Sequence, residues 1–203
     1  MTNLPDLRTA IKLWQDSVSG ICEWSSKEWL RDYIYHTNGV AVSAQKIADK
    51  CGLNPEKAYI IGILHDYGKI QNEKATNYPH FLLGYDKMTE LGYFDVAKVC
   101  LTHSFPIKDF DFNNYIAYSK ENLSVVKNLL KDIEYDDYDR LIQLCDILFE
   151  GINTVRYEYR ILQIQQRYKL TADQTKGLEI GAKQNKEYFD KKCGCDIYKL
   201  LKI

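Results

Sequence analysis

The chain has 203 residues, of which 45% are hydrophobic, and these values are typical of one globular domain or of one domain with appendages. Its 27 basic and 28 acidic side chains leave a formal net charge of −1, and no basic stripe runs along the sequence. A nucleic-acid polymer or an anionic membrane surface is therefore a poor candidate for its partner, and no apolar stretch reaches membrane-spanning length.

The chain contains six cysteines, and four of them are scattered through helical patterns at positions 22, 51, 100 and 145. The charged start of the sequence, from Asp6 to Asp16, does not resemble a secretory signal. We therefore expect reduced cysteines in a cytoplasmic protein. The close pair Cys193 and Cys195 has no neighbouring ligands that would complete a zinc site.

The apolar residues recur with helical spacing, and no alternation persists long enough to build a sheet, so the sequence predicts an all-α fold. Residues 5–33 predict one or two helices. Their shared apolar face consists of Ile11, Trp14, Val18, Ile21 and Cys22. After a turn at His36, the next helix is expected from about Val40 to Lys50, with its end at Gly52.

Asn54 followed by Pro55 predicts an N-cap with proline in the first helical position. The helix that starts there should carry the pair His65-Asp66 near its C-terminal end and stop at Gly68. Further helices are expected over about 80–91, ending at Gly92, and over about 95–103.

The aromatic stretch 104–118, with Phe105, Phe110, Phe112 and Tyr115, predicts either a loop that covers a pocket or a surface loop held by its own aromatic rings. The acidic run 132–139 predicts a solvated loop and a helix start. Helices are expected over about 120–131, 138–152, 155–168 and 171–191, the last opened by a capping box of Thr171 and Gln174.

The pair His65-Asp66 ends the apolar run 59–64 and is the most informative feature of the sequence. A carboxylate on the buried side of such a segment is costly unless a positive group pairs with it. A divalent cation removes that cost, and imidazole and carboxylate are ligands for the same borderline metals. Asp146 is a second acid within an apolar stripe, because Ile142, Asp146 and Phe149 lie at i, i+4 and i+7.

The chain has only four histidines, so the ligand search is short. His36, His65, Asp66 and Asp146 supply one complete ligand set, and His80 and His103 remain for a second ion. A lone histidine on an apolar face is more often a core residue bonded to a carbonyl, and a lone buried aspartate more often pairs with Lys or Arg. The combination of these residues favours the metal interpretation.

In their order on a helical chain, His36, His65-Asp66 and Asp146 resemble the H…HD…D signature of the HD-domain superfamily. The members of this superfamily are all-helical, metal-dependent phosphohydrolases. The segment from His65 to Lys69 is similar to an HD-x-G-K variant whose lysine contacts substrate phosphate. The resemblance covers about residues 30–150 and implies a helical bundle with flanking helices over 1–29 and 151–203. We expect residues 1–203 to form a single domain of this type.

The resemblance implies hydrolysis of a small phosphate ester, such as a nucleotide, by metal-activated water. The cofactor would be one or two divalent ions of iron, manganese, zinc, cobalt, nickel or magnesium. Asp66 would bridge the ions and orient the water, Lys69 would bind a phosphate oxygen, and Arg156 is a second anion-binding candidate. The alternatives are a di-iron oxygenase and a non-catalytic nucleotide-binding module, in a monomer or homodimer.

Overall fold

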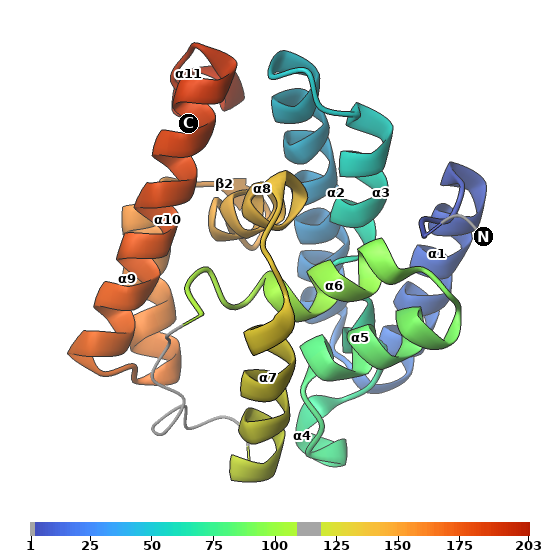
Figure 1. The fold of residues 1–203 in the computed structure, drawn as a ribbon. Helices are drawn as coiled ribbons and strands as arrows, with labels where there is room; N and C mark the ends of the chain where they lie inside the picture. Colours follow the sequence, from blue (N-terminus) through green and yellow to red (C-terminus); the bar gives the residue numbers. More distant parts are fainter. Residues whose placement is uncertain (1–2, 109–118) are drawn as a thin grey trace.

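The computed structural model describes residues 3–108 and 119–203 and confirms the all-α prediction (Figure 1). In chain order the elements are α1 (Leu7–Trp24), α2 (Lys27–Lys50), α3 (Pro55–Leu64), the 3-10 helix η1 (Tyr67–Ile70), α4 (Glu73–Thr76), α5 (His80–Glu90), α6 (Phe94–Thr102), α7 (Lys120–Asp132), α8 (Asp137–Ile147), β1 (Phe149–Glu150), β2 (Asn153–Thr154), α9 (Tyr157–Tyr168), α10 (Ala172–Cys193) and α11 (Ile197–Leu201). In Figure 1, α8 lies between the pair α2–α3 and the C-terminal helix α10.

The turn predicted at His36 is wrong, because His36 lies in the middle of the continuous helix α2. The next two residues are polar, and both bond back to the preceding helical turn. The Thr37 hydroxyl donates to the Tyr33 carbonyl at 3.0 Å, and the Asn38 amide donates to the Ile34 carbonyl at 2.8 Å. These bonds let polar side chains stay inside a helix that also positions His36.

Gly39 is a position of close approach and does not break the helix. A Cβ built there would lie 2.1 Å from the Phe149 ring, so only glycine lets the ring pack on α2 at this point. The predicted end of α2 is confirmed, since the helix stops at Lys50 and Gly52 has a φ of +76°.

Helix α3 begins as predicted, with the Asn54 side chain accepting a hydrogen bond from the Lys57 amide. The helix ends at Leu64, so His65 is its C-cap and Asp66 precedes η1. Gly68 lies inside η1 and does not end α3, which corrects the prediction. A Cβ at Gly68 would lie 1.9 Å from the His80 carbonyl oxygen, so the glycine is needed where η1 meets α5.

Helices α5 and α6 confirm the predictions to within one residue at each end. On α1, Ile21 is buried as expected, but Cys22 is exposed and does not belong to the buried face. Phe105 is fully buried and packs against Phe81, with ring centroids 5.1 Å apart. The other aromatic residues of the predicted loop, Phe110, Phe112 and Tyr115, lie outside the described residues.

Helix α8 ends at Ile147, five residues before the predicted end, because the chain enters a short antiparallel hairpin of β1 and β2. Gly151 turns this hairpin with a φ of +56°.

The acidic run before α8 is only partly solvated: Asp136 forms the N-cap in a capping box, and Asp139 is fully buried. The Thr171–Gln174 capping box of α10 is confirmed, whereas α11 had no predicted counterpart.

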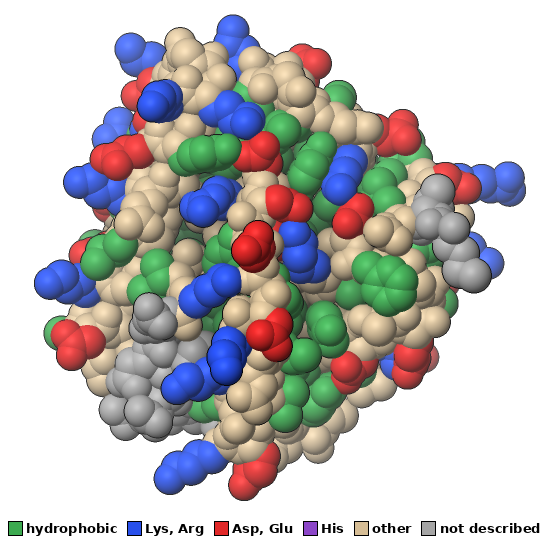
Figure 2. Space-filling model, viewed as in Figure 1, with side chains coloured by type: hydrophobic (Ala, Val, Ile, Leu, Met, Phe, Trp, Pro, Cys, Tyr) green, Lys and Arg blue, Asp and Glu red, His purple; other side chains and the backbone are tan. Residues whose placement is uncertain are grey.

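The flanking helices share a core with the central helices. One cluster of buried residues joins Ala10 of α1 and Phe189 of α10 to residues of α2, α3, α6 and α8. Figure 2 shows basic and acidic side chains interspersed over one face of the molecule. Within residues 3–108 and 119–203, no helix combines the length and apolar character needed to cross a lipid bilayer.

Candidate metal centre

His65 and Asp66 are both buried, each 1% exposed, at the junction of α3 and η1. The His65 ring is held by its Nδ1, which donates to the Gly62 carbonyl at 2.7 Å. Among the described residues, the opposite ring nitrogen, Nε2, and Asp66 Oδ1 are buried without a hydrogen-bond partner. Buried polar atoms are rarely left unpaired, so these two atoms fit a site completed by a cation.

Four of the predicted ligands converge from helices α2 and α8 and from the junction of α3 and η1. His36 Nε2 lies 2.9 Å from Asp146 Oδ1 and 3.6 Å from Asp66 Oδ2. His65 Nε2 lies 3.5 Å from Asp66 Oδ2 and 3.8 Å from Asp146 Oδ1. The ligand atoms of His36, His65 and Asp66 are close enough to one another to contact one ion at about 2.0–2.2 Å, and Asp146 lies beside the two histidines.

The other two predicted ligands lie on the opposite side of Asp66. Asp66 Oδ1 is 3.4 Å from His80 Nε2 and 3.5 Å from His103 Nε2, and these two nitrogens are 3.3 Å apart. Each oxygen of Asp66 therefore faces a different histidine pair. This arrangement gives two groups that could each hold a metal ion, with Asp66 common to both.

The Nδ1 atoms of His80 and His103, on the far side of each ring from Asp66, hold the rings in place. His80 Nδ1 donates to Glu73 Oε1 at 2.9 Å, and His103 Nδ1 donates to the Cys100 carbonyl at 2.9 Å. Burial alone would raise the pKa of Glu73, but His80 lowers it to about 2, so the carboxylate is ionised. Partners of this kind fix the tautomer and the direction of a ligating imidazole. No sequence pattern marks Glu73, because the residue belongs to the four-residue helix α4.

A family model described as "HD domain" matches residues 33–149, which is more than half of the chain. The chain belongs to the HD-domain family. No curated protein and no solved structure matches it. HD-domain proteins are generally metal-dependent hydrolases, and the matched segment contains all six residues of the His/Asp cluster. Helix α1 and the segment from β2 onward lie outside the match.

Lys69 of this HD domain lies one turn beyond the dyad, with its Nζ 2.5 Å from Asp66 Oδ2. Burial would lower the pKa of Lys69, but the neighbouring Asp66 carboxylate outweighs it and raises the pKa. In the same way, burial would raise the pKa of Asp66, whereas Lys69 and the surrounding imidazoles hold it well below its usual value. The pair is therefore an ammonium and a carboxylate at neutral pH.

Asp146, His36 and His103 also have pKa shifts toward the protonation states that metal ligands need. Burial would raise the pKa of Asp146, but the neighbouring imidazoles of His36 and His65 hold it well below its usual value. Burial lowers the pKa of His36 and of His103, which favours neutral rings. For His65 burial also acts to lower the pKa, but the two carboxylates outweigh it and the pKa is raised.

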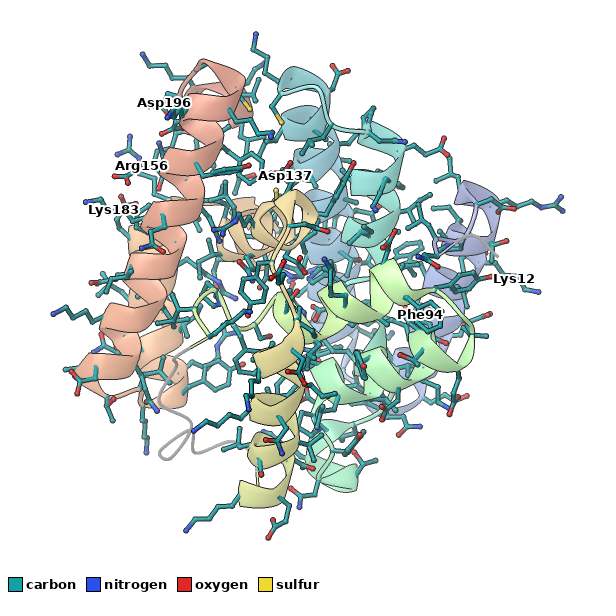
Figure 3. The ribbon with its side chains drawn as sticks, in the orientation of Figure 1. Lys12, Phe94, Asp137, Arg156, Lys183 and Asp196 are labelled. Atoms are coloured by element: carbon teal, nitrogen blue, oxygen red, sulfur yellow. The ribbon has the colours of Figure 1, made fainter. Side chains whose placement is uncertain are left out.

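Arg156, the second anion-binding candidate, is not among the side chains that the structure brings to the cluster. It is exposed at the N-cap of α9, and its guanidinium lies 5.1 Å from the centre of the Tyr198 ring, on the C-terminal side of the molecule (Figure 3). Arg160, one turn further along α9, is mostly buried and forms an ion pair with Glu150. Burial lowers the pKa of Arg160, and the carboxylates of Asp146 and Asp66 offset this only in part.

Exposure differs across the cluster and indicates its open side. The side chains of His65, Asp66 and His103 are at most 2% exposed. Lys69 and Asp146 are 25% and 28% exposed, so they lie on the side from which solvent reaches the HD-domain site. A ligand that enters from this side would meet the Lys69 ammonium before it meets the buried dyad.

Proposed function

We propose that this HD-domain protein is a metal-dependent phosphohydrolase that cleaves a small phosphate ester, such as a nucleotide, with two divalent ions. The observation that carries this proposal is the position of Asp66, whose two oxygens face two separate histidine pairs. A carboxylate shared in this way is typical of two-metal hydrolytic sites, in which the ions lie about 3.5–4 Å apart.

The ligand assignment follows the geometry. We assign His36, His65, Asp66 and Asp146 to the first ion, and Asp66, His80 and His103 to the second. Two bound cations would stabilise the attacking and leaving oxygens of a phosphoryl displacement and lower the pKa of water. A donor set rich in imidazole suits iron, manganese, zinc, cobalt or nickel better than magnesium, which prefers oxygen ligands.

The side chains around the ligands have separate roles in this proposal. Lys69, at the exposed side, donates to a non-bridging phosphate oxygen and so anchors the substrate as a point charge. Asp66 holds the Lys69 ammonium in place until a phosphate competes for it. Arg160, which pairs with Glu150 just beyond the end of α8, is a candidate beside Arg156 for binding an anionic group of the substrate.

Removal and restoration of the metal tests this function directly. The protein is purified without added metal, its metal content is measured, and the ion is then stripped with a chelator. We expect the stripped protein to be inactive on a panel of nucleotides, phosphomonoesters and phosphodiesters, and the restored ion to return hydrolysis of at least one class. A fully loaded protein that is inert on the whole panel contradicts the proposal.

Two outcomes of that experiment would favour other functions. A protein that retains iron, is coloured and is inert toward phosphate esters would favour a di-iron oxygenase, because four imidazoles and two carboxylates also suit iron. Tight nucleotide binding without turnover under any divalent ion would favour a non-catalytic module.

Glu73→Ala should weaken the second ion selectively. The substitution removes the acceptor that fixes His80, and loss of such a partner typically costs about 10–100-fold in metal affinity. We expect a loss of this size for the second equivalent of Mn²⁺ in a binding titration, with the first equivalent little changed. Glu90→Ala is the matched control, since Glu90 is exposed and pairs with Lys87 on the same helix as His80. Equal titrations for the two variants would show that Glu73 does not support a metal ligand.

A further inference from the structure

A chain of buried amides connects the C-terminal helix α10 to the end of α6. Asn185 of α10 is 2% exposed, and its Nδ2 donates to Gln143 Oε1 at 3.0 Å. Gln143 of α8 is 4% exposed, and its Nε2 donates to the carbonyl oxygens of Thr102 at 3.0 Å and Phe105 at 3.3 Å. Asn185 lies outside the segment that matches the HD-domain family, whereas the other three residues lie inside it.

The two carbonyls that Gln143 binds stand on either side of His103. Thr102 is the last residue of α6, and the last carbonyls of a helix have no partner within the helix. The Phe105 amide donates to the Thr102 carbonyl at 3.0 Å, so residues 102–105 form a tight turn with His103 inside it. The amide of Gln143 therefore holds the backbone of His103 from both ends of this turn.

A second polar contact from α8 holds the same turn. The Thr102 hydroxyl donates to Asp139 Oδ1 at 2.7 Å, and Asp139 Oδ2 pairs with Lys98 of α6 at 2.7 Å. Thr102 and Asp139 are both fully buried. Because this contact involves residues of α6 and α8 alone, it would stay in place when the bond from α10 is removed.

Helix α10 also packs closely against the chain just after His103. A Cβ at Gly181 would lie 2.5 Å from the Pro106 side chain, so the helix backbone passes close to this proline. About three turns further along α10, Lys192 pairs with Asp137 of α8 at 3.1 Å. Helix α10 is thus fixed against α8 and against the segment that follows His103.

We propose that Asn185, acting through Gln143, is a positioning residue for His103, so that the C-terminal helix α10 sets the affinity of the second metal ion. The inference rests on the two-ion form of the proposed function. The orientation of the Gln143 amide is its physical basis. While Asn185 donates to Oε1, the NH₂ group must face the carbonyls of Thr102 and Phe105.

Two changes at Asn185 break this arrangement in different ways. Asn185→Ala leaves Gln143 Oε1 buried without a donor, so the amide is free to turn. Asn185→Asp has nearly the same shape but offers only acceptors when ionised, so the Gln143 NH₂ would turn toward it and present Oε1 to the two carbonyls. The second variant separates hydrogen bonding from packing, because it fills the same volume.

The experiment is a titration of the metal-stripped full-length protein with Mn²⁺, with free Mn²⁺ counted by electron paramagnetic resonance at a temperature well below the unfolding midpoint of every variant. We expect wild-type protein to take up two ions. In Asn185→Ala and Asn185→Asp, the second ion should bind at least about tenfold more weakly than in wild type, which is the loss typical of outer partners of metal ligands. The affinity for the first ion should stay within about twofold of wild type. His103→Ala, which lacks the ligand itself, should show complete loss of the second ion and bind a single ion.

Leu178→Ala is the matched control, since Leu178 is a buried residue of the same helix outside the amide chain. It should lower the unfolding midpoint and leave both affinities unchanged. Equal second-ion affinity in wild type and both Asn185 variants overturns the inference, as does an equal loss in Leu178→Ala. Wild-type protein that binds one ion overturns this inference and the two-ion proposal together, whereas hydrolysis that survives with one ion would retain the phosphohydrolase assignment.

Discussion

Asp66→Asn should remove both metal ions in one step and leave no measurable hydrolysis. The carboxylate oxygens of Asp66 face His36 and His65 on one side and His80 and His103 on the other, so neither ligand group is complete without it. Loss of even one electrostatic donor at a reaction centre costs about 10²–10³ in kcat. Loss of the group that both ions share should therefore exceed that range.

The measurement for this variant combines metal content, activity and circular dichroism. We expect less than one ion per chain and a helical spectrum close to that of wild type, since an amide of the same shape replaces the carboxylate. Asp86→Asn is the matched control, because Asp86 of α5 is a half-buried aspartate that accepts a hydrogen bond from Tyr78 and belongs to neither ligand group. If Asp66→Asn retained wild-type metal content and activity, the assignment of the site would be wrong.

The convergence of the cluster could be predicted from the sequence because its members interrupt apolar patterns. A histidine and an aspartate at the end of the run 59–64, and Asp146 in the stripe of α8, are residues that a core does not contain without a partner. The structure brings these residues together with His36, His80 and His103, as the sequence analysis expected. That they bind metal remains a prediction.

The groups that support the cluster could not be predicted, because their contacts are distant in sequence. Asp139 belongs to an acidic run that is typical of a solvated loop, yet it is buried against Lys98 of α6, 41 residues earlier. Arg160 lies four residues beyond the arginine that the sequence favoured, and only the fold of the β1–β2 hairpin places it beside Glu150. No local pattern marks either residue.

Glycines were the least reliable markers of helix ends. Gly52 and Gly92 follow helices and have positive φ angles, as the sequence predicted. Gly39 and Gly68 look the same in sequence but serve close packing, against Phe149 and against the backbone of α5. Local sequence cannot separate the two uses, because the contact that requires the glycine is made by another part of the chain.

Gly68→Ala tests the contact between η1 and α5, which are the elements that follow Asp66 and begin with His80. The added Cβ would lie 1.9 Å from the His80 carbonyl oxygen and 2.7 Å from the Gly84 amide nitrogen. Both are backbone atoms, so relief requires η1 and α5 to move apart. We expect a loss of about 3 kcal/mol in the free energy of unfolding, at the upper end of overpacking costs. For a chain of this size that corresponds to a fall of about 6–12 °C in Tm.

The same displacement should separate His80 from Asp66, so the second ion should be lost before the first in a Mn²⁺ titration of this variant. Gly84→Ala is the matched comparison across the same contact: its Cβ would lie 3.0 Å from Cβ and Sγ of Cys100 and 3.4 Å from the Gly68 amide nitrogen, so its neighbours must shift by only a few tenths of an ångström. Alanine also favours the helix by about 1 kcal/mol, so we expect a much smaller fall in Tm than for Gly68→Ala. A Gly68→Ala protein with the wild-type Tm and two bound ions would mean that η1 and α5 do not approach each other this closely. In that case their contact could not be what sets the distance between His80 and Asp66.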